Sequence, residues 1–89
     1  MIKDNFKLNI NFEGLHLEVD YGLTENKVGD FIIYGFIIKC ADKQNNTYTE
    51  RGFLDFTTDL SYAKNTFKML INNQVLPLSL INVLDDLVA

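Results

Sequence analysis

Apolar and polar side chains alternate with a period of two from Phe6 to Tyr21, and the phase of this alternation reverses across Glu13-Gly14. Successive side chains of a strand point to opposite faces, so the pattern predicts two antiparallel strands joined by a two-residue turn. The register that starts by pairing Phe12 with Leu15 sets every apolar residue against another apolar residue. A slip by one residue would set apolar against polar along the whole ladder, so the pattern fixes one register.

The next part of the chain predicts a second pair of strands. Residues 22–30 are polar with glycine and asparagine breakers, which indicates a connection. From Phe31 to Ile38 neither the odd nor the even positions are polar, so this strand needs cover on both of its faces. Residues 41–46 are typical of a turn, and Thr47–Phe56 is rich in strand-forming residues.

Two amphipathic helices are predicted at the end of the chain. Either Thr58 or Asp59 is suited to cap a helix over residues 60–73, whose apolar positions form one stripe at 3.6 residues per turn. A second helix begins around Pro77, which fits a first-turn position because proline lacks the N–H donor, and it runs to about Val88. Its apolar positions spread over roughly 160°, wider than one buried stripe requires.

The order β-β-β-β-α-α predicts an α+β fold, a two-layer sandwich of a four-stranded antiparallel sheet with both helices on one face, in one domain spanning residues 1–89. Helices on one face leave the other face of the doubly apolar strand without cover. We therefore expect a homodimer, or a protein partner docked on the sheet. The pattern does not decide which side is uncovered: one group contains Phe31, Ile33 and Ile37, and the other is the predicted partner-binding set, Ile32, Tyr34, Phe36 and Ile38, together with Phe53 from the return strand.

Composition narrows the classes of partner. The chain has 89 residues, 47% of them hydrophobic, and a formal charge of −4 with its eight basic residues dispersed. Nucleic-acid binding requires a basic patch, so we expect no nucleic-acid partner. We expect no membrane association and a cytoplasmic location, because the chain has no secretion-signal pattern and no run of eighteen apolar residues.

The sequence shows no catalytic, cofactor-binding or metal-binding signature, and we expect no enzyme. The only imidazole, His16, falls on the polar face of the first hairpin, and the only thiol, Cys40, has no base nearby in the sequence. Asp85 and Asp86 are helix neighbours that point about 100° apart, so they do not share one site. Metal-ligand spacing and a glycine-rich phosphate loop are both missing from the sequence.

Two other functions stay open. Gly35 and Gly52 fall on adjacent predicted strands, where missing side chains would leave room for a small molecule or peptide between sheet and helices. The small acidic chain is also compatible with a phage-type inhibitor of a host protein.

Four features of the sequence resemble a family of short, functionally uncharacterised bacterial proteins. They are Tyr34-Gly35-Phe36-Ile37-Ile38, the acidic residue Glu50 on the return strand, Thr58-Asp59 at the start of a helix, and the closing segment from Val75 to Leu87. Members of that family look like a Tyr-Gly-Ile strand followed by Val-x-Pro-x-His-Leu-x-Asp-Val-Val-x-Asp-Phe-Leu. The resemblance covers residues 34–88 and supports the fold, but it implies no activity. This chain has Ser79 and Asn82 where the family pattern has His and Asp, so neither position is a catalytic group common to the family.

Overall fold

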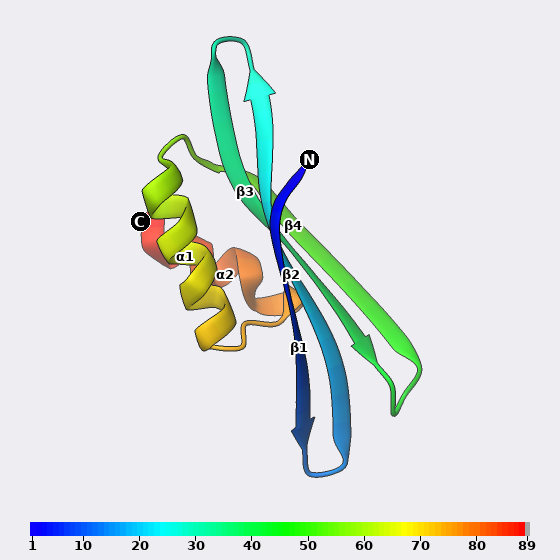
Figure 1. Ribbon diagram of the computed structural model, residues 1–89. Coiled ribbons are helices and arrows are strands. Elements are labelled where there is room, and N and C mark those ends of the chain that lie inside the picture. Colours follow the sequence, from blue (N-terminus) through cyan, green and yellow to red (C-terminus); the bar gives the residue numbers. More distant parts are fainter. Residues whose placement is uncertain (89) are drawn as a thin grey trace.

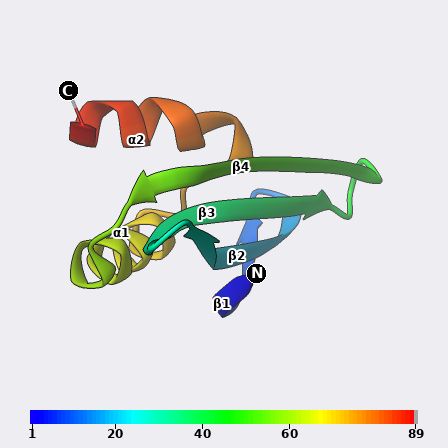
Figure 2. The same ribbon diagram turned by 90° about the horizontal axis from the view of Figure 1, so that it is seen from above.

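Four strands follow one another along the chain and lie in the same order in one antiparallel sheet. The computed structural model describes residues 1–88, except for the side chains of Phe12 and Val88. The elements are β1 (Ile2–Phe12), β2 (Leu15–Val28), β3 (Phe31–Asp42), β4 (Thr47–Thr57), α1 (Leu60–Asn72), the 3-10 turn η1 (Pro77–Ser79) and α2 (Leu80–Val88). Both helices lie on the same side of the sheet (Figures 1 and 2), so the predicted α+β architecture is confirmed.

The first hairpin has the predicted register throughout, from Phe12 opposite Leu15 to Phe6 opposite Tyr21. Its two turn residues have positive φ, +48° at Glu13 and +83° at Gly14. Two-residue hairpin turns of type I′ require positive φ at both positions, because their twist matches that of the strands. Glycine adopts this conformation freely, whereas glutamate does not.

We expect Glu13→Asn to raise the free energy of unfolding by about 0.5–1 kcal/mol, because asparagine tolerates the left-handed region that glutamate must adopt here. Thermal denaturation followed by circular dichroism measures the change. Glu13→Gln is the matched control, since it removes the same charge without favouring positive φ. An equal gain in both variants would assign the effect to charge instead of backbone conformation.

The prediction of a loop over residues 22–30 is wrong, because β2 continues to Val28 and turns into β3 through Gly29-Asp30. Thr24 pairs with Ile2, and Tyr34 pairs with Thr57. Beyond these two positions, no other strand of the described residues 1–88 lies next to this hairpin in the sheet. Residues 26–33 therefore form a two-stranded extension, called the arm below, which projects past the rest of the sheet (Figure 1). Gly22 and Asn26 are tolerated inside the strand because pairing with β3 outweighs their low strand propensity.

A bulge in β4 places three residues, 54–56, opposite the single residue Gly35 of β3. The two extra residues interrupt the alternation within the bulge, and both Phe53 and Phe56 pack against the core. The ring of Phe56 lies 5.2 Å from that of Phe36 and 5.3 Å from that of Tyr62. The backbone of β4 also passes so close to Gly35 that a Cβ there would lie 2.4 Å from the Cα and O atoms of Leu54.

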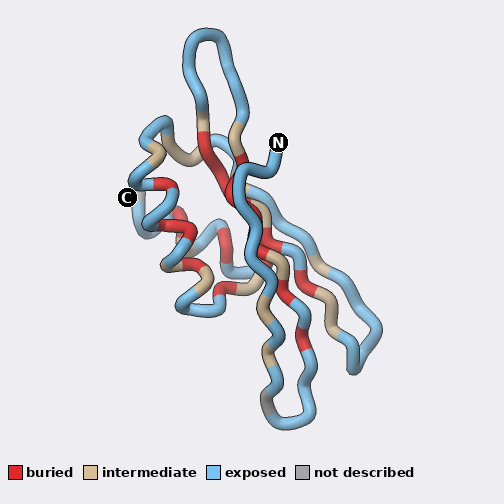
Figure 3. The backbone as a smooth tube through the Cα atoms, viewed as in Figure 1, coloured by how far each residue is buried: buried red, intermediate tan, exposed pale blue. Residues whose placement is uncertain are grey.

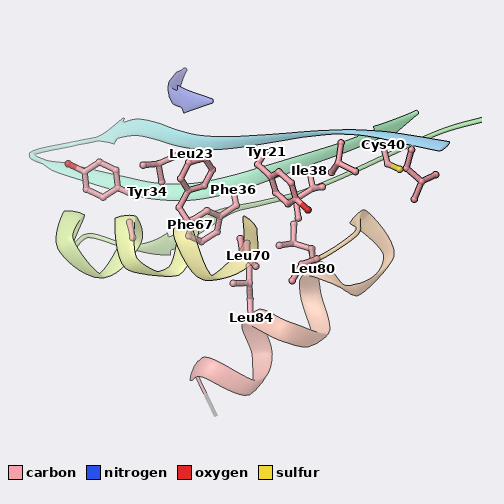
Figure 4. Packing of buried hydrophobic residues seen from close by; sticks show 14 residues of the cluster. Tyr21, Leu23, Tyr34, Phe36, Ile38, Cys40, Phe67, Leu70, Leu80 and Leu84 are labelled. Carbon is pink, nitrogen blue, oxygen red and sulfur yellow. The ribbon is translucent and has the colours of Figure 1, made fainter. Parts of the chain in front are cut away.

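The hydrophobic core lies between the sheet and the helices. Side chains of β2 and β3 point from the sheet toward α1 and α2 (Figure 4). The fully buried members are Val19, Tyr21, Leu23, Phe36, Ile38, Ala63, Leu70, Leu80 and Leu84. We call this side of the sheet the helix face. Burying each large apolar side chain contributes about 1.5–3 kcal/mol, so this layer accounts for most of the stabilisation of the fold.

The start of α1 is set by the predicted capping chemistry. The carboxylate of Asp59 accepts a hydrogen bond from the backbone N–H of Tyr62, with a distance of 3.1 Å between the two atoms. This contact satisfies one of the free N–H groups in the first turn of the helix. The stripe that α1 buries includes Ala63, Phe67 and Leu70, as its spacing predicts.

Candidate functional site

The sequence-based choice of docking residues needs a correction. Tyr34, Phe36 and Ile38 belong to the helix face and are only 7%, 0% and 0% exposed. Phe53 pairs with Phe36 and packs against the same core. The helices of the same chain already cover Tyr34, Phe36 and Ile38, and Phe53 is half-buried, so these four residues do not form an open surface for a partner. Ile32 alone of the predicted set is exposed, and it lies on the arm.

The other apolar group of β3 lies on the side of the sheet turned away from the helices, which we call the open face. Because side chains alternate along a strand, Ile33 and Ile37 point opposite to Phe36 and Ile38. The side chain of Ile2 reaches the position above Gly22, next to Ile37, and the side chain of Leu54 lies beside Gly52. The apolar members of the open face are Ile2, Ile37 and Leu54, followed on the arm by Val28, Phe31 and Ile33.

The arm exposes three large apolar side chains within eight residues. Phe31 is 67% exposed, and Val28 and Ile32 are also exposed. Figure 3 shows the arm in pale blue beyond the buried centre of β2 and β3. Within the described part of the chain, neither edge of the arm pairs with another strand. An isolated two-stranded ribbon is at best marginally stable in water. A contact that covers the arm would therefore also stabilise its pairing.

The polar part of the open face alternates in charge. Lys7, Asp20, Lys39 and Glu50 face one another in turn across the four strands. The Lys39 Nζ atom lies 3.8 Å from the Glu50 Oε1 atom. The Tyr48 hydroxyl donates a 3.0 Å hydrogen bond to the same carboxylate, and this bond raises the pKa of Tyr48. The row therefore carries both signs of charge, although the chain as a whole is acidic.

Two hollows lie at different places on the sheet. One, of about 320 Å³, lies on the open face, with Lys39, Ala41 and Tyr48 among its lining residues. The other, of about 410 Å³, lies between the sheet and η1 and is lined largely by apolar side chains, including Leu17, Cys40 and Leu76. The second hollow matches the predicted pocket more closely, because it lies between the sheet and the helical part of the chain.

Gly35 and Gly52 do not form that pocket. Both glycines lie on the open face, like Ile37. Gly52 stands opposite Ile37 on β4, and Gly35 lies two residues before Ile37 on β3, which puts its position on the same face. The backbone of β4 fills the space above Gly35, so the missing side chain leaves no hollow there.

The side chains that could act as catalytic groups or metal ligands do not lie close together. His16 is exposed at the end of the first hairpin, and Asp85 and Asp86 are exposed on α2. Burial, followed by the carboxylate of Asp42, raises the pKa of the Cys40 thiol, which disfavours the nucleophilic thiolate. Within residues 1–88, no three histidine, cysteine, aspartate or glutamate side chains gather as a metal site would require. Neither helix of the described chain is long and apolar enough to cross a membrane.

Three members of the open face were missed by the sequence reasoning. Ile2 lies outside the alternating segment, Leu54 is placed by the bulge, and Val28 was assigned to a loop. Of these three residues, only Val28 could have been assigned to the open face from the sequence pattern. A two-residue turn at Gly29-Asp30 pairs it with Phe31 and extends the alternation of β3 back into β2.

The fold and the open face together define a small α+β domain with an apolar and charge-alternating sheet surface. The chain belongs to a family of unknown function, DUF6514, whose model matches residues 6–89. This confirms the resemblance to a functionally uncharacterised family and extends the matched part of the chain toward the N-terminus. No curated protein and no solved structure matches the chain.

Proposed function

We propose that this protein is a non-enzymatic cytoplasmic interaction domain that self-associates through the open face of its sheet. The observation that carries the proposal is the apolar group on that face, in particular Ile33, Ile37 and Leu54, which the helices of the same chain do not cover. Apolar side chains gathered on a surface gain free energy when a contact removes them from water. A second copy suits the face because its charged row contains both signs.

The mixed signs of that row favour another protein over a nucleic acid, which would need a basic surface. The apolar side chains also lie along two adjacent strands instead of lining an enclosed pocket. An extended surface of this kind suits a protein partner better than a small ligand.

We expect Ile37→Lys to abolish self-association, because it places an unpaired charge in the middle of the apolar group. Size-exclusion chromatography with light scattering compares it with the wild-type protein. Leu54→Lys is a second variant at a more exposed position, in case the first impairs folding. Ile81→Lys is the matched control, because Ile81 is an exposed isoleucine on α2, away from the open face. Unchanged association in both open-face variants, with their fold intact by circular dichroism, would remove the proposal.

A small-molecule site is the second candidate, supported by the hollow beside η1. Its volume of about 410 Å³ and its apolar lining fall in the range of ligand sites. Thermal denaturation separates the two functions: ligand binding raises the melting temperature with ligand concentration, whereas self-association raises it with protein concentration.

A further inference from the structure

The open face of β3 and β4 carries three cross-strand pairs, each made of unlike side chains. Ala41 pairs with Tyr48, Lys39 with Glu50, and Ile37 with Gly52. In the first and third pairs a small residue faces a large one, and in the middle pair a cation faces an anion. We call these three pairs the β3–β4 strip.

This arrangement is self-complementary under one symmetry operation. A two-fold axis that runs parallel to the strands, between β3 and β4, exchanges the positions of the two strands. It therefore places each residue of the strip over its cross-strand partner in the second copy. Charge would then meet opposite charge, and a large side chain would meet a small one.

We infer that two copies of this chain pack face to face about such an axis, with Lys39 of each copy opposite Glu50 of the other and Tyr48 opposite Ala41. This inference rests on the proposed function and assigns the partner, the strands and the register. Closed two-fold dimers are the commonest assembly of identical chains, and they require a self-complementary patch. Two packed sheets keep their strands within about 30° of each other, so the match is closest at the central pair.

The shape of the strip supports this register. Tyr48 is 62% exposed, while Ala41 lines the 320 Å³ hollow of the open face. The tyrosine ring of one copy therefore has a place to enter on the other. Gly52 has no side chain and the side chain of Ile37 leans toward it, with its Cγ1 atom 3.4 Å from the position of an added Cβ. The side chains of Ile37 and Leu54 border the position over Gly52, so Ile37 of the second copy would pack against apolar atoms there.

The charges support the same register. Each chain carries a net charge of −4, so most face-to-face contacts between two copies would be repulsive. The strip contributes one cation and one anion, so it is neutral. The 3.8 Å distance between the charged atoms of Lys39 and Glu50 is long for a direct hydrogen bond. In the dimer each carboxylate would gain a second ammonium group from the other copy.

The contact area sets the expected strength. The strip occupies two strands of a molecule whose extents are 47 × 25 × 17 Å. An interface confined to two strands falls at the low end for specific contacts, below about 1,200 Å² in total, so we expect reversible association that depends on protein concentration. The axis also brings the β3 edges of the two arms near each other, which would let Phe31 of each copy contribute.

The test uses two charge reversals, Lys39→Glu and Glu50→Lys, studied by sedimentation velocity. We expect each variant alone to dimerise at least tenfold more weakly than the wild-type protein, because like charges would face each other across the axis. An equimolar mixture of the two variants should recover a dissociation constant within about threefold of the wild-type value. In that mixture both contacts between chains again join opposite charges.

The mixture separates contacts between chains from contacts within a chain. Within each single variant, positions 39 and 50 carry like charges whether or not the other variant is present. Recovery on mixing therefore reports only the contact between the chains. The double variant Lys39→Glu/Glu50→Lys restores both kinds of contact, so it should dimerise by itself even if a single variant folds poorly.

The outcomes distinguish this register from the proposed function. Suppose that the wild-type protein dimerises and Ile37→Lys prevents it, but both charge reversals dimerise normally or their mixture shows no recovery. The register is then overturned while the open face remains the interface. A wild-type protein that stays monomeric throughout the concentration series overturns both.

Discussion

Gly35→Ala is expected to lower the free energy of unfolding by about 3 kcal/mol or more, a large part of the 5–15 kcal/mol typical of a small domain. An added Cβ would lie 2.4 Å from the Cα and O atoms of Leu54 and from the O atom of Phe53. These are backbone atoms of a paired strand, so they cannot move aside as the end of a flexible side chain can. Either the bulge of β4 or its pairing with β3 has to break.

The matched control is Gly52→Ala, on the neighbouring strand of the same face. An added Cβ there has no neighbour closer than 3.4 Å, and that neighbour is a side-chain atom of Ile37. We expect a change between zero and a gain of about 1 kcal/mol, because alanine loses less conformational entropy than glycine on folding. Urea denaturation at a protein concentration below that of self-association measures both variants. Equal stabilities of the two variants would contradict the close approach of β4 to Gly35.

The second large effect concerns Tyr21 at alkaline pH. This side chain is 0% exposed in the core, and its hydroxyl has no hydrogen-bond partner within the described chain. Burial, with a smaller contribution from Cys40, raises the pKa of Tyr21 to about 12 from its usual 10.0. The folded protein therefore keeps this proton at a pH at which the unfolded chain releases it.

The sign of the effect follows from that difference. The stability associated with protonated Tyr21 is fully present below pH 10 and is lost as the pH rises from about 10 to 12. The two-unit difference corresponds to about 2–3 kcal/mol by pH 12. Tyr21→Phe cannot ionise, so its stability should fall less steeply over this interval. At pH 7 it should be about 1 kcal/mol more stable than the wild-type protein, since it removes an unpaired buried hydroxyl.

Urea denaturation of both proteins at pH 7, 10 and 11.5 tests this prediction. The other ionisable groups are present in both proteins, so the difference between the two curves isolates Tyr21. Parallel curves, with no divergence above pH 10, would mean that the Tyr21 hydroxyl reaches water.

The sequence predicted the parts of the fold that depend on local patterns. The register of the first hairpin follows from strict alternation on both sides of Glu13-Gly14, and the start of α1 follows from the capping residue Asp59. In both places the preference of the local sequence agrees with the long-range packing. Agreement of this kind is typical of segments that can be assigned from sequence alone.

The choice of open face failed for a specific reason. A strand that is apolar on both sides contains no information about which side the helices cover. That information lies in its pairing with β2, where Tyr21 and Leu23 stand opposite Ile38 and Phe36. The pairing could not be derived while residues 22–30 were interpreted as a loop, because the register depends on the two-residue turn at Gly29-Asp30.

The bulge of β4 was beyond the reach of sequence patterns. Phe53, Leu54 and Phe56 do not alternate consistently, and two extra residues in a strand explain why. The bulge depends on the contact between β4 and Gly35, which joins segments almost twenty residues apart in the chain. The positions of Phe53 in the core and of Leu54 on the open face follow from that contact.

Sedimentation equilibrium of the wild-type protein over a concentration series from about 5 µM to 1 mM tests the central claim most directly. If a second copy covers the open face, the average mass will rise from the 10.2 kDa of one chain toward twice that value, with no larger species. A mass that stays at 10.2 kDa throughout would contradict the account, because the apolar group around Ile37 would then remain in water.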